Sequence, residues 1–175
     1  MNFYIGDTHF GHKNCIKHDN RPFYFIEDHD RVLMDLWNDR VSSTDDVIIV
    51  GDFTYKAKEH FSYYASKLNG RKILVVGNHD KHIVRDPAFE SHFSEKYDML
   101  EVVDGQHKIF ICHCPMAEWP GTYHGVKHFY AHVHGNPNPA HEFMKTQPGA
   151  YNVGAMHQKW RPWTAEEVIA KRMSF

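Results

Sequence analysis

Short apolar runs in this sequence end, one after another, in residues whose side chains can bind a cation or carry a proton. Each run is typical of a β-strand, and side chains that follow the strands of an α/β protein meet at one edge of the sheet. The pattern therefore predicts an α/β fold with one polar site built from strand ends. The clusters are Asp7-Thr8-His9, Gly51-Asp52, Gly77-Asn78-His79-Asp80, the single residue His113, and His132-Val133-His134.

The first half of the chain alternates strand and helix patterns. Strands are expected at residues 2–6, 47–50 and 73–76, and helices at 27–41 and 57–69. The run at 47–50 is apolar throughout, which suits a strand buried on both faces. The alternation predicts parallel strands. Residues 8–26 are expected to form a long irregular loop, and loops of that length in a compact domain are usually functional.

The second half of the chain indicates antiparallel pairing and then a closing helix. Runs at 99–103 and 108–112 flank Asp104-Gly105, which is a strong hairpin signal. Two more short strands are expected at 129–131 and 151–153. A capping box from Thr164 to Glu167 opens a last helix that reaches about Arg172.

Length and composition limit the number of domains, the binding partners and the cellular compartment that we expect. The 175 residues suit one domain, 1–175, and the net charge of −2 gives no global attraction to nucleic acid or to a membrane surface. The N-terminus has no signal-peptide pattern, and no apolar run approaches the length of a membrane span. Three cysteines without a spaced framework fit a reducing compartment. We therefore expect a cytoplasmic protein that does not bind membranes or extended nucleic acid.

The clusters supply seven candidate metal ligands. Carboxylate and amide oxygens with neutral imidazole nitrogens suit Mn, Zn, Fe or Mg rather than an Fe–S cluster. Seven ligands are too many for one four-coordinate metal and about right for two. His79 and Asp80, which follow Asn78 in the sequence, are expected to form a dyad in which the carboxylate orients the imidazole. Gly77 is expected to let the chain turn sharply before them. The seven are Asp7, His9, Asp52, Asn78, His113, His132 and His134.

Taken together, the clusters resemble the calcineurin-like metallophosphoesterases, over most of the chain and in the order typical of that family. Residues 7–12 and 21–23 are further similar to a small, single-domain branch found in bacteria and their phages. The resemblance implies a four-layer α/β/β/α sandwich with mixed parallel and antiparallel sheets. It also implies two divalent metal ions, with Mn favoured and Zn, Fe, Ni or Mg compatible.

Positions carried across from the resemblance give each residue a role. One metal would be held by Asp7, His9, Asp52 and His134, and the other by Asp52, Asn78, His113 and His132, with Asp52 as the bridge. His79 would be the catalytic histidine and Asp80 its orienting partner. Ala131 stands where the family usually has glycine, and it is strained if that position needs a positive φ but harmless if it needs only a small residue. Phe53-Thr54 also lacks the acidic or histidine residue that some members carry there.

The function implied by the resemblance is a metal-dependent phosphoesterase. A hydroxide held between the two metals would attack a small phosphodiester or a nucleotide, and the small domain without an obvious cap favours diesters. His12 and Arg21, on the 8–26 loop, are expected to contact this substrate. The alternatives are a phosphomonoesterase or protein phosphatase, and a non-catalytic metal-binding scaffold of the same fold.

Overall fold

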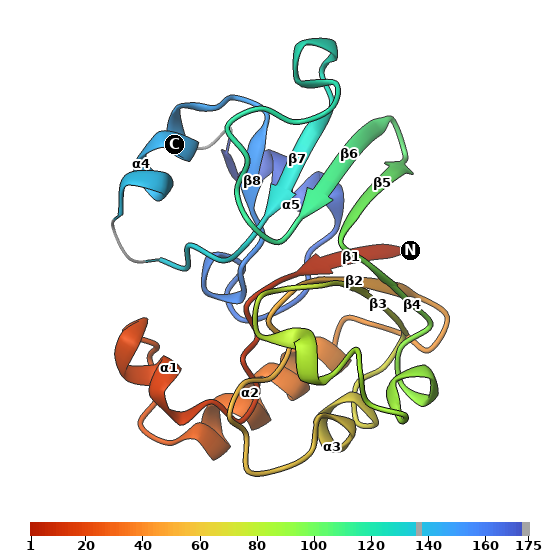
Figure 1. The fold of residues 1–175 in the computed structure, drawn as a ribbon, viewed down its shortest axis with the longest axis vertical. Helices are drawn as coiled ribbons and strands as arrows, with labels where there is room; N and C mark the ends of the chain where they lie inside the picture. Colours follow the sequence, from red (N-terminus) through yellow and green to blue (C-terminus); the bar gives the residue numbers. More distant parts are fainter. Residues whose placement is uncertain (136–137, 173–175) are drawn as a thin grey trace.

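Two four-stranded sheets pack face to face in the computed structural model, which describes residues 1–135 and 138–172 (Figure 1). The first sheet is parallel and contains, in spatial order, β1 (Asn2–Ile5), β2 (Asp46–Val50), β3 (Arg71–Val75) and β4 (Glu95–Tyr97). The second contains β5 (Met99–Asp104), β6 (His107–Cys112), β7 (Lys127–Tyr130) and β8 (Ala150–Asn152). Strand β5 runs antiparallel to β6, whereas β6, β7 and β8 are parallel.

Strand β2 illustrates how the sequence builds a core on each side of the first sheet. Successive side chains of a strand point to opposite faces. Val47 and Ile49 therefore join the core on the outer side, while Ile48 and Val50 join the core between the two sheets. All four side chains are buried, as the continuous apolar run predicts for a strand covered on both faces.

Helices cover the outer face of each sheet, and the last helix packs beside the core between the two sheets. They are α1 (Lys13–His18), α2 (Ile26–Asn38), α3 (Phe61–Ala65), α4 (Pro139–Thr146) and α5 (Ala165–Arg172), with 3₁₀ turns at Asp80–His82, Phe89–Ser91, Thr122–His124 and Ala155–His157. Leu33 of α2 and Phe61 of α3 pack in the core of the first sheet, and Met144 of α4 packs against Phe110 of the second. Val168 of α5 enters the core between the sheets. The layer order confirms the predicted four-layer sandwich (Figure 1).

Several elements differ from the sequence-based expectations. The loop expected at 8–26 contains α1, and the helix expected at 57–69 is confined to α3, which begins after His60 caps the nitrogen of Ser62. Two elements are not predicted. Strand β4 is short and partly exposed, so it leaves no apolar run. Helix α4 begins where the Asn138 side chain accepts the backbone N–H of His141, which is a local start signal without a long apolar stripe behind it.

The expected turns of the second half are present. The hairpin pairs Met99 with Cys112 and Asp104 with His107. The capping box is formed in both directions, because Glu167 Oε2 accepts the backbone N–H of Thr164 at 2.9 Å and Thr164 Oγ1 accepts that of Glu167 at 3.4 Å. Within the described residues, no helix combines the length and the apolar character that a membrane-spanning helix requires.

Candidate metal centre

All seven predicted ligands lie close together, just beyond the ends of five strands. Asp7 and His9 follow β1, and Asp52 and Asn78 follow β2 and β3 of the same sheet. The second sheet supplies the remaining three, because its strands β6 and β7 end at the same edge of the sandwich. These three are His113, His132 and His134.

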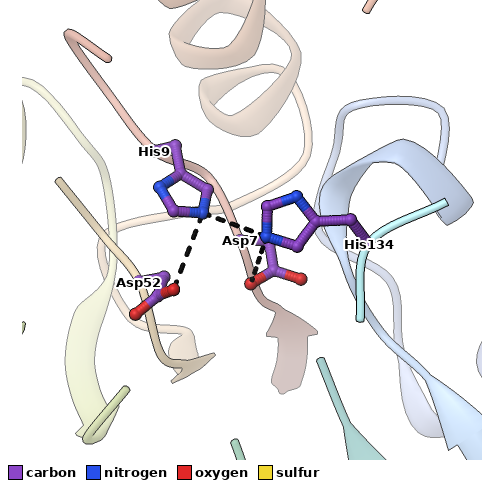
Figure 2. A group of neighbouring side chains, drawn as sticks. All are labelled: Asp7, His9, Asp52 and His134. Carbon is purple, nitrogen blue, oxygen red and sulfur yellow. Dashed lines mark hydrogen bonds and ion pairs between the residues drawn. The ribbon is translucent and has the colours of Figure 1, made fainter. Parts of the chain in front are cut away.

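One group of four donors consists of three buried side chains, Asp7, His9 and Asp52, and the partly exposed His134 (Figure 2). One donor atom from each of Asp7, His9, Asp52 and His134 lies within 4.8 Å of every other. His9 Nε2 is 3.6 Å from Asp52 Oδ2 and 3.3 Å from His134 Nε2, which is itself 3.7 Å from Asp7 Oδ1. These side chains therefore face a common centre rather than pairing off.

The carboxylate of Asp7 in this donor group is buried without a compensating hydrogen bond from the part of the chain that the structure describes. Asp7 is fully buried, and neither of its side-chain oxygens has a hydrogen-bond partner among the described residues. An ionised carboxylate buried without a partner is strongly unfavourable unless a cation or a proton compensates it. Two carboxylates and two imidazoles around one point are a donor set for a divalent metal ion. The residues present fit such an ion.

A second group shares Asp52 with the first. Donor atoms of Asp52, His113 and His132 lie within 4.8 Å of one another. His113 Nδ1 donates to the Val50 carbonyl at 2.9 Å, so the Nε2 of the neutral ring carries a lone pair. In this neutral form, Nε2 faces Asp52 Oδ2 at 3.4 Å and Asn78 Oδ1 at 3.0 Å as an acceptor. Acceptors that face one another in this way fit a second cation, and Asp52 lies between the two groups.

The electrostatics of both groups reflect this crowding. Burial lowers the pKa of His113, but its contact with Asp52 and the charges of Asp7 and Asp52 outweigh burial and raise the pKa to about 9. Burial raises the pKa of Asp7 and lowers the pKa of His9. Burial would also raise the pKa of Asp52, but contact with His113 and the charges of His113 and His9 hold it well below the ordinary value. Metal binding to these side chains would therefore displace protons.

Five of the seven candidate ligands have a left-handed backbone, which non-glycine residues rarely adopt. The φ values are 50° for Asp7, 49° for His9, 56° for Asp52, 68° for His132 and 48° for His134. Such conformations are unfavourable and persist only where the surrounding structure holds them, and they concentrate at functional sites. The strain therefore marks the same residues as the donor geometry does.

Two glycines allow the close approach of these segments. A Cβ at Gly77 would lie 2.4 Å from Asp52 Oδ1, and a Cβ at Gly51 would lie 2.3 Å from His113 Nδ1. Gly51 also has a positive φ of 76°, whereas Gly77 has none. Gly77 is therefore needed for room beside Asp52 rather than for the sharp turn expected from the sequence.

Ala131 is accommodated without strain. The positive φ falls on His132 and His134, and Ala131 is not among the residues with positive φ. Its side chain is buried against Gly6, where a Cβ would come within 2.6 Å of the Ala131 Cβ. The position needs a small residue, so alanine is harmless there.

His79 lies beside the two groups and is half-buried. Its backbone N–H donates to Asp52 Oδ1 at 2.9 Å, and its Nε2 is 3.9 Å from Asp52 Oδ2. The ring packs on Tyr55 with centroids 3.7 Å apart, and the His12 ring contacts the Tyr55 ring edge-on with centroids 4.9 Å apart. His12 is thus at the mouth of the site, where its predicted contact with substrate stays a prediction.

Asp80 contacts backbone groups instead of the His79 ring that it is expected to orient. Its Oδ2 accepts the N–H groups of Asp52 at 2.7 Å and Gly77 at 2.8 Å, and its Oδ1 accepts that of Phe53 at 2.9 Å. Asp80 therefore joins the loops that follow β2 and β3. It acts on the site by holding these loops in place, because their backbone donors would otherwise be buried without acceptors.

Arg21 is also placed differently from the sequence-based expectation. Its side chain is buried, with a relative exposure of 4%, so the predicted grip on a substrate is wrong for this structure. Its guanidinium donates to the carbonyls of Asp7 and Thr8, each at 3.0 Å, and pairs with Asp19. The carbonyls at the end of β1 need donors, and the fork of an arginine supplies several at once.

Two residues near the site are not predicted from the sequence. Asp19 Oδ1 is 2.8 Å from His134 Nδ1, and Tyr55 stacks on His79. Neither residue follows a strand or has ligand spacing, so no local signal marks it. A cavity of about 600 Å³ opens beside Asp19 and is lined by Asp19, Cys114, Pro115, His132, Val133, His134, Asn138 and Ala140.

Comparison with known proteins finds relatives by sequence. No family model matches the chain. An uncharacterized protein of Methanocaldococcus jannaschii, MJ1445, is 28% identical over 173 residues, which cover 95% of this chain and 88% of that protein. The gene 66 protein of Mycobacterium phage L5 is 35% identical over 81 residues, which cover 45% of this chain and 39% of that protein.

A solved structure shares the architecture. The protein of unknown function AQ665 from Aquifex aeolicus matches with a TM-score of 0.76 and 23% identity over 98% of both chains. Weaker matches are the Pseudomonas putida nuclease MPE (TM-score 0.47, 20% identity, 76% of this chain and 60% of that one) and the E. coli phosphoesterase YfcE (0.43, 11%, 87% and 77%). The sheets, their layers and the strand ends that carry the polar residues are those that the metallophosphoesterase resemblance implies. At 23% identity, the match to AQ665 shows the fold alone.

Proposed function

We propose that this protein is a metal-dependent phosphoesterase that hydrolyses a small phosphodiester. The observation that carries the proposal is the pair of donor groups joined by Asp52, one of which contains the fully buried carboxylate of Asp7 without a hydrogen-bond partner among the described residues. An arrangement of this kind is unfavourable without cations and well suited to two of them. Manganese is our first choice of metal, with Zn, Fe, Ni and Mg as the alternatives.

The residues around the donor groups would have separate roles in the reaction. Two divalent cations held by the donor groups would supply an activated water and neutralise charge on the phosphoryl oxygens. His79, half-buried beside the two donor groups, would protonate the leaving oxygen or stabilise the phosphoryl group. Tyr55 packs on the His79 ring and restricts its orientation. Asp80 keeps the loops of Asp52 and Gly77 together.

The cavity beside the site supports a diester over a monoester. Its lining contains no lysine or arginine among the described residues, and the one arginine expected there, Arg21, is buried behind Asp7. A phosphomonoester carries up to two negative charges and gains more from such cations than a diester with one. The volume of about 600 Å³ suits a small substrate such as a nucleotide diester.

The test is hydrolysis of a chromogenic phosphodiester and of its monoester counterpart by metal-stripped protein, reloaded separately with Mn, Zn, Fe, Ni and Mg. We expect metal-dependent turnover with a higher rate on the diester, and loss of turnover without loss of metal binding in His79→Ala. Preference for the monoester would favour a phosphomonoesterase or protein phosphatase. Two bound metals without turnover on either ester would favour a non-catalytic scaffold.

A further inference from the structure

The geometry points to Asp19 as a positioning residue that fixes one imidazole of the candidate metal centre, His134, and ties it to the end of β1 through Arg21. This inference rests on the proposed metal-dependent function and goes beyond it. Asp19 follows α1, far in sequence from His134, yet its Oδ1 lies 2.8 Å from His134 Nδ1. The carboxylate is nearly buried, with a side-chain exposure of 4%.

This contact sets which nitrogen of His134 faces the donor group. A carboxylate paired with a guanidinium can only accept a hydrogen bond, so Nδ1 carries the hydrogen and the Nε2 of the neutral ring keeps its lone pair. Nε2 is the atom that lies 3.7 Å from Asp7 Oδ1 and 3.3 Å from His9 Nε2. A second residue that holds the far nitrogen of a ligating histidine fixes both its tautomer and its ring orientation.

Arg21 connects this contact to the strained segment after β1. Its guanidinium reaches Asp19 Oδ2 at 3.0 Å and donates to the Asp7 and Thr8 carbonyls, also at 3.0 Å. The same side chain donates to His29 Nε2 at 2.8 Å. One buried guanidinium thus sets the position of His134's partner relative to the backbone of Asp7, although β1 and β7 belong to different sheets.

The far end of the strained segment is held by a continuation of this network. His29 Nδ1 is 2.8 Å from Asp30 Oδ1, and Asp30 Oδ2 accepts the backbone N–H of Gly11 at 2.9 Å. Arg21 at one end and Asp30 at the other therefore hold the segment that contains Asp7 and His9. Both of these residues have a left-handed backbone that requires such support.

The two donor groups should respond differently to loss of Asp19. His134 belongs only to the group of Asp7 and His9, whereas His113 in the other group is oriented by the Val50 carbonyl. Removing Asp19 would therefore weaken one of two bound metals and leave the other unchanged. General damage to the fold would weaken both, which separates positioning from a merely structural role.

The experiment compares Asp19→Ala and Asp19→Asn with Asp86→Ala in calorimetric titrations of the metal-free proteins with Mn²⁺. Asp86 makes a matched Asp–His contact on the surface, 3.0 Å from His60 Nε2, and belongs to neither donor group. We expect Asp19→Ala to weaken one of two Mn²⁺ sites by about 10- to 100-fold and to leave the other unchanged. Asp19→Asn keeps an acceptor oxygen and is expected to lose less, and Asp86→Ala is expected to match wild type.

A metal-free readout accompanies the titration. Nitrogen NMR of the imidazoles, at a pH where His134 is neutral and with His134→Gln for assignment, should show a hydrogen on Nδ1 in wild type and a tautomer mixture in Asp19→Ala. Three results with Asp19→Ala would overturn the inference and leave the proposed function intact: wild-type Mn²⁺ affinity at both sites, an equal loss of affinity at both sites, or an unchanged tautomer of His134. A wild-type protein that binds no Mn²⁺ would overturn both.

Discussion

The close approach of Gly77 to Asp52 yields a prediction whose size follows from the structure. A Cβ at residue 77 would lie 2.4 Å from Asp52 Oδ1 and 2.5 Å from the Asp52 nitrogen, where ordinary contacts begin at 3.4 Å. Gly77→Ala therefore forces one of the two segments to move by about 1 Å, from the difference between these distances. Because Asp52 is shared by both donor groups, the displacement is expected to weaken both metal sites together.

The expected magnitudes can be measured separately. Overpacking of this kind lowers the free energy of unfolding by about 1–3 kcal/mol, which urea unfolding of the metal-free variant would report. A misplacement of about 1 Å at a reacting centre lowers turnover by about 100-fold, which the diester assay would report alongside Mn²⁺ titration. The control is Gly135→Ala, because a Cβ there would meet its nearest neighbour, Met156 Cγ, at 3.6 Å.

Gly77→Asn separates two reasons for a glycine at this position. Asparagine tolerates a left-handed backbone better than alanine does, so a glycine kept for its turn would accept asparagine with little loss. A glycine kept for room would reject asparagine at least as strongly as alanine. Wild-type Mn²⁺ affinity and turnover in Gly77→Ala would refute the reasoning.

Three further predictions concern histidines. Burial lowers the pKa of His128 to about 4, below its unfolded value of about 6.5, so the unfolded chain takes up the proton first. The free energy of unfolding should therefore fall by up to about 3 kcal/mol as the pH falls from 6.5 to 4, with no further loss from this residue below pH 4. Urea unfolding of His128→Gln at several pH values should lack this pH-dependent loss. A pH profile of stability identical to that of the wild type would contradict the prediction. His79→Ala should keep its Mn²⁺ affinity and lose at least about 100-fold in turnover, whereas His124→Ala, on an exposed 3₁₀ turn, should match wild type. His132→Gly should be about 1 kcal/mol more stable than His132→Ala when metal-free, because residue 132 has a φ of 68°; equal urea midpoints would argue against strain there.

The part of the fold that depends on local pattern is predictable from the sequence. Continuous apolar runs predict β2 and β3, and their polar ends place Asp52 and Asn78 at the same edge of a parallel sheet. The hairpin of β5 and β6 follows from Asp104-Gly105 between two apolar runs. These elements carry their own signals, so the convergence of the candidate ligands could be expected before any coordinates were known.

The supporting contacts are not predictable in the same way. Whether Arg21 points into a substrate cavity or behind Asp7 depends on which carbonyls lack donors once β1 has paired with its neighbours. Asp80 likewise accepts backbone hydrogens from loops that meet only in the folded chain. Such partners are far apart in sequence and are selected by unsatisfied backbone groups, which a local pattern does not record.

The candidate ligands come from both halves of the sandwich, with the carboxylates and His9 on one sheet and His113, His132 and His134 on the other. Bound cations would therefore cross-link the two halves of the sandwich through their ligands. A force that separates the two halves would act on these bonds, so the force at which the halves part should rise when metal is added. Removing the metal with a chelator would then lower the force needed to separate the two halves, while each sheet stays folded.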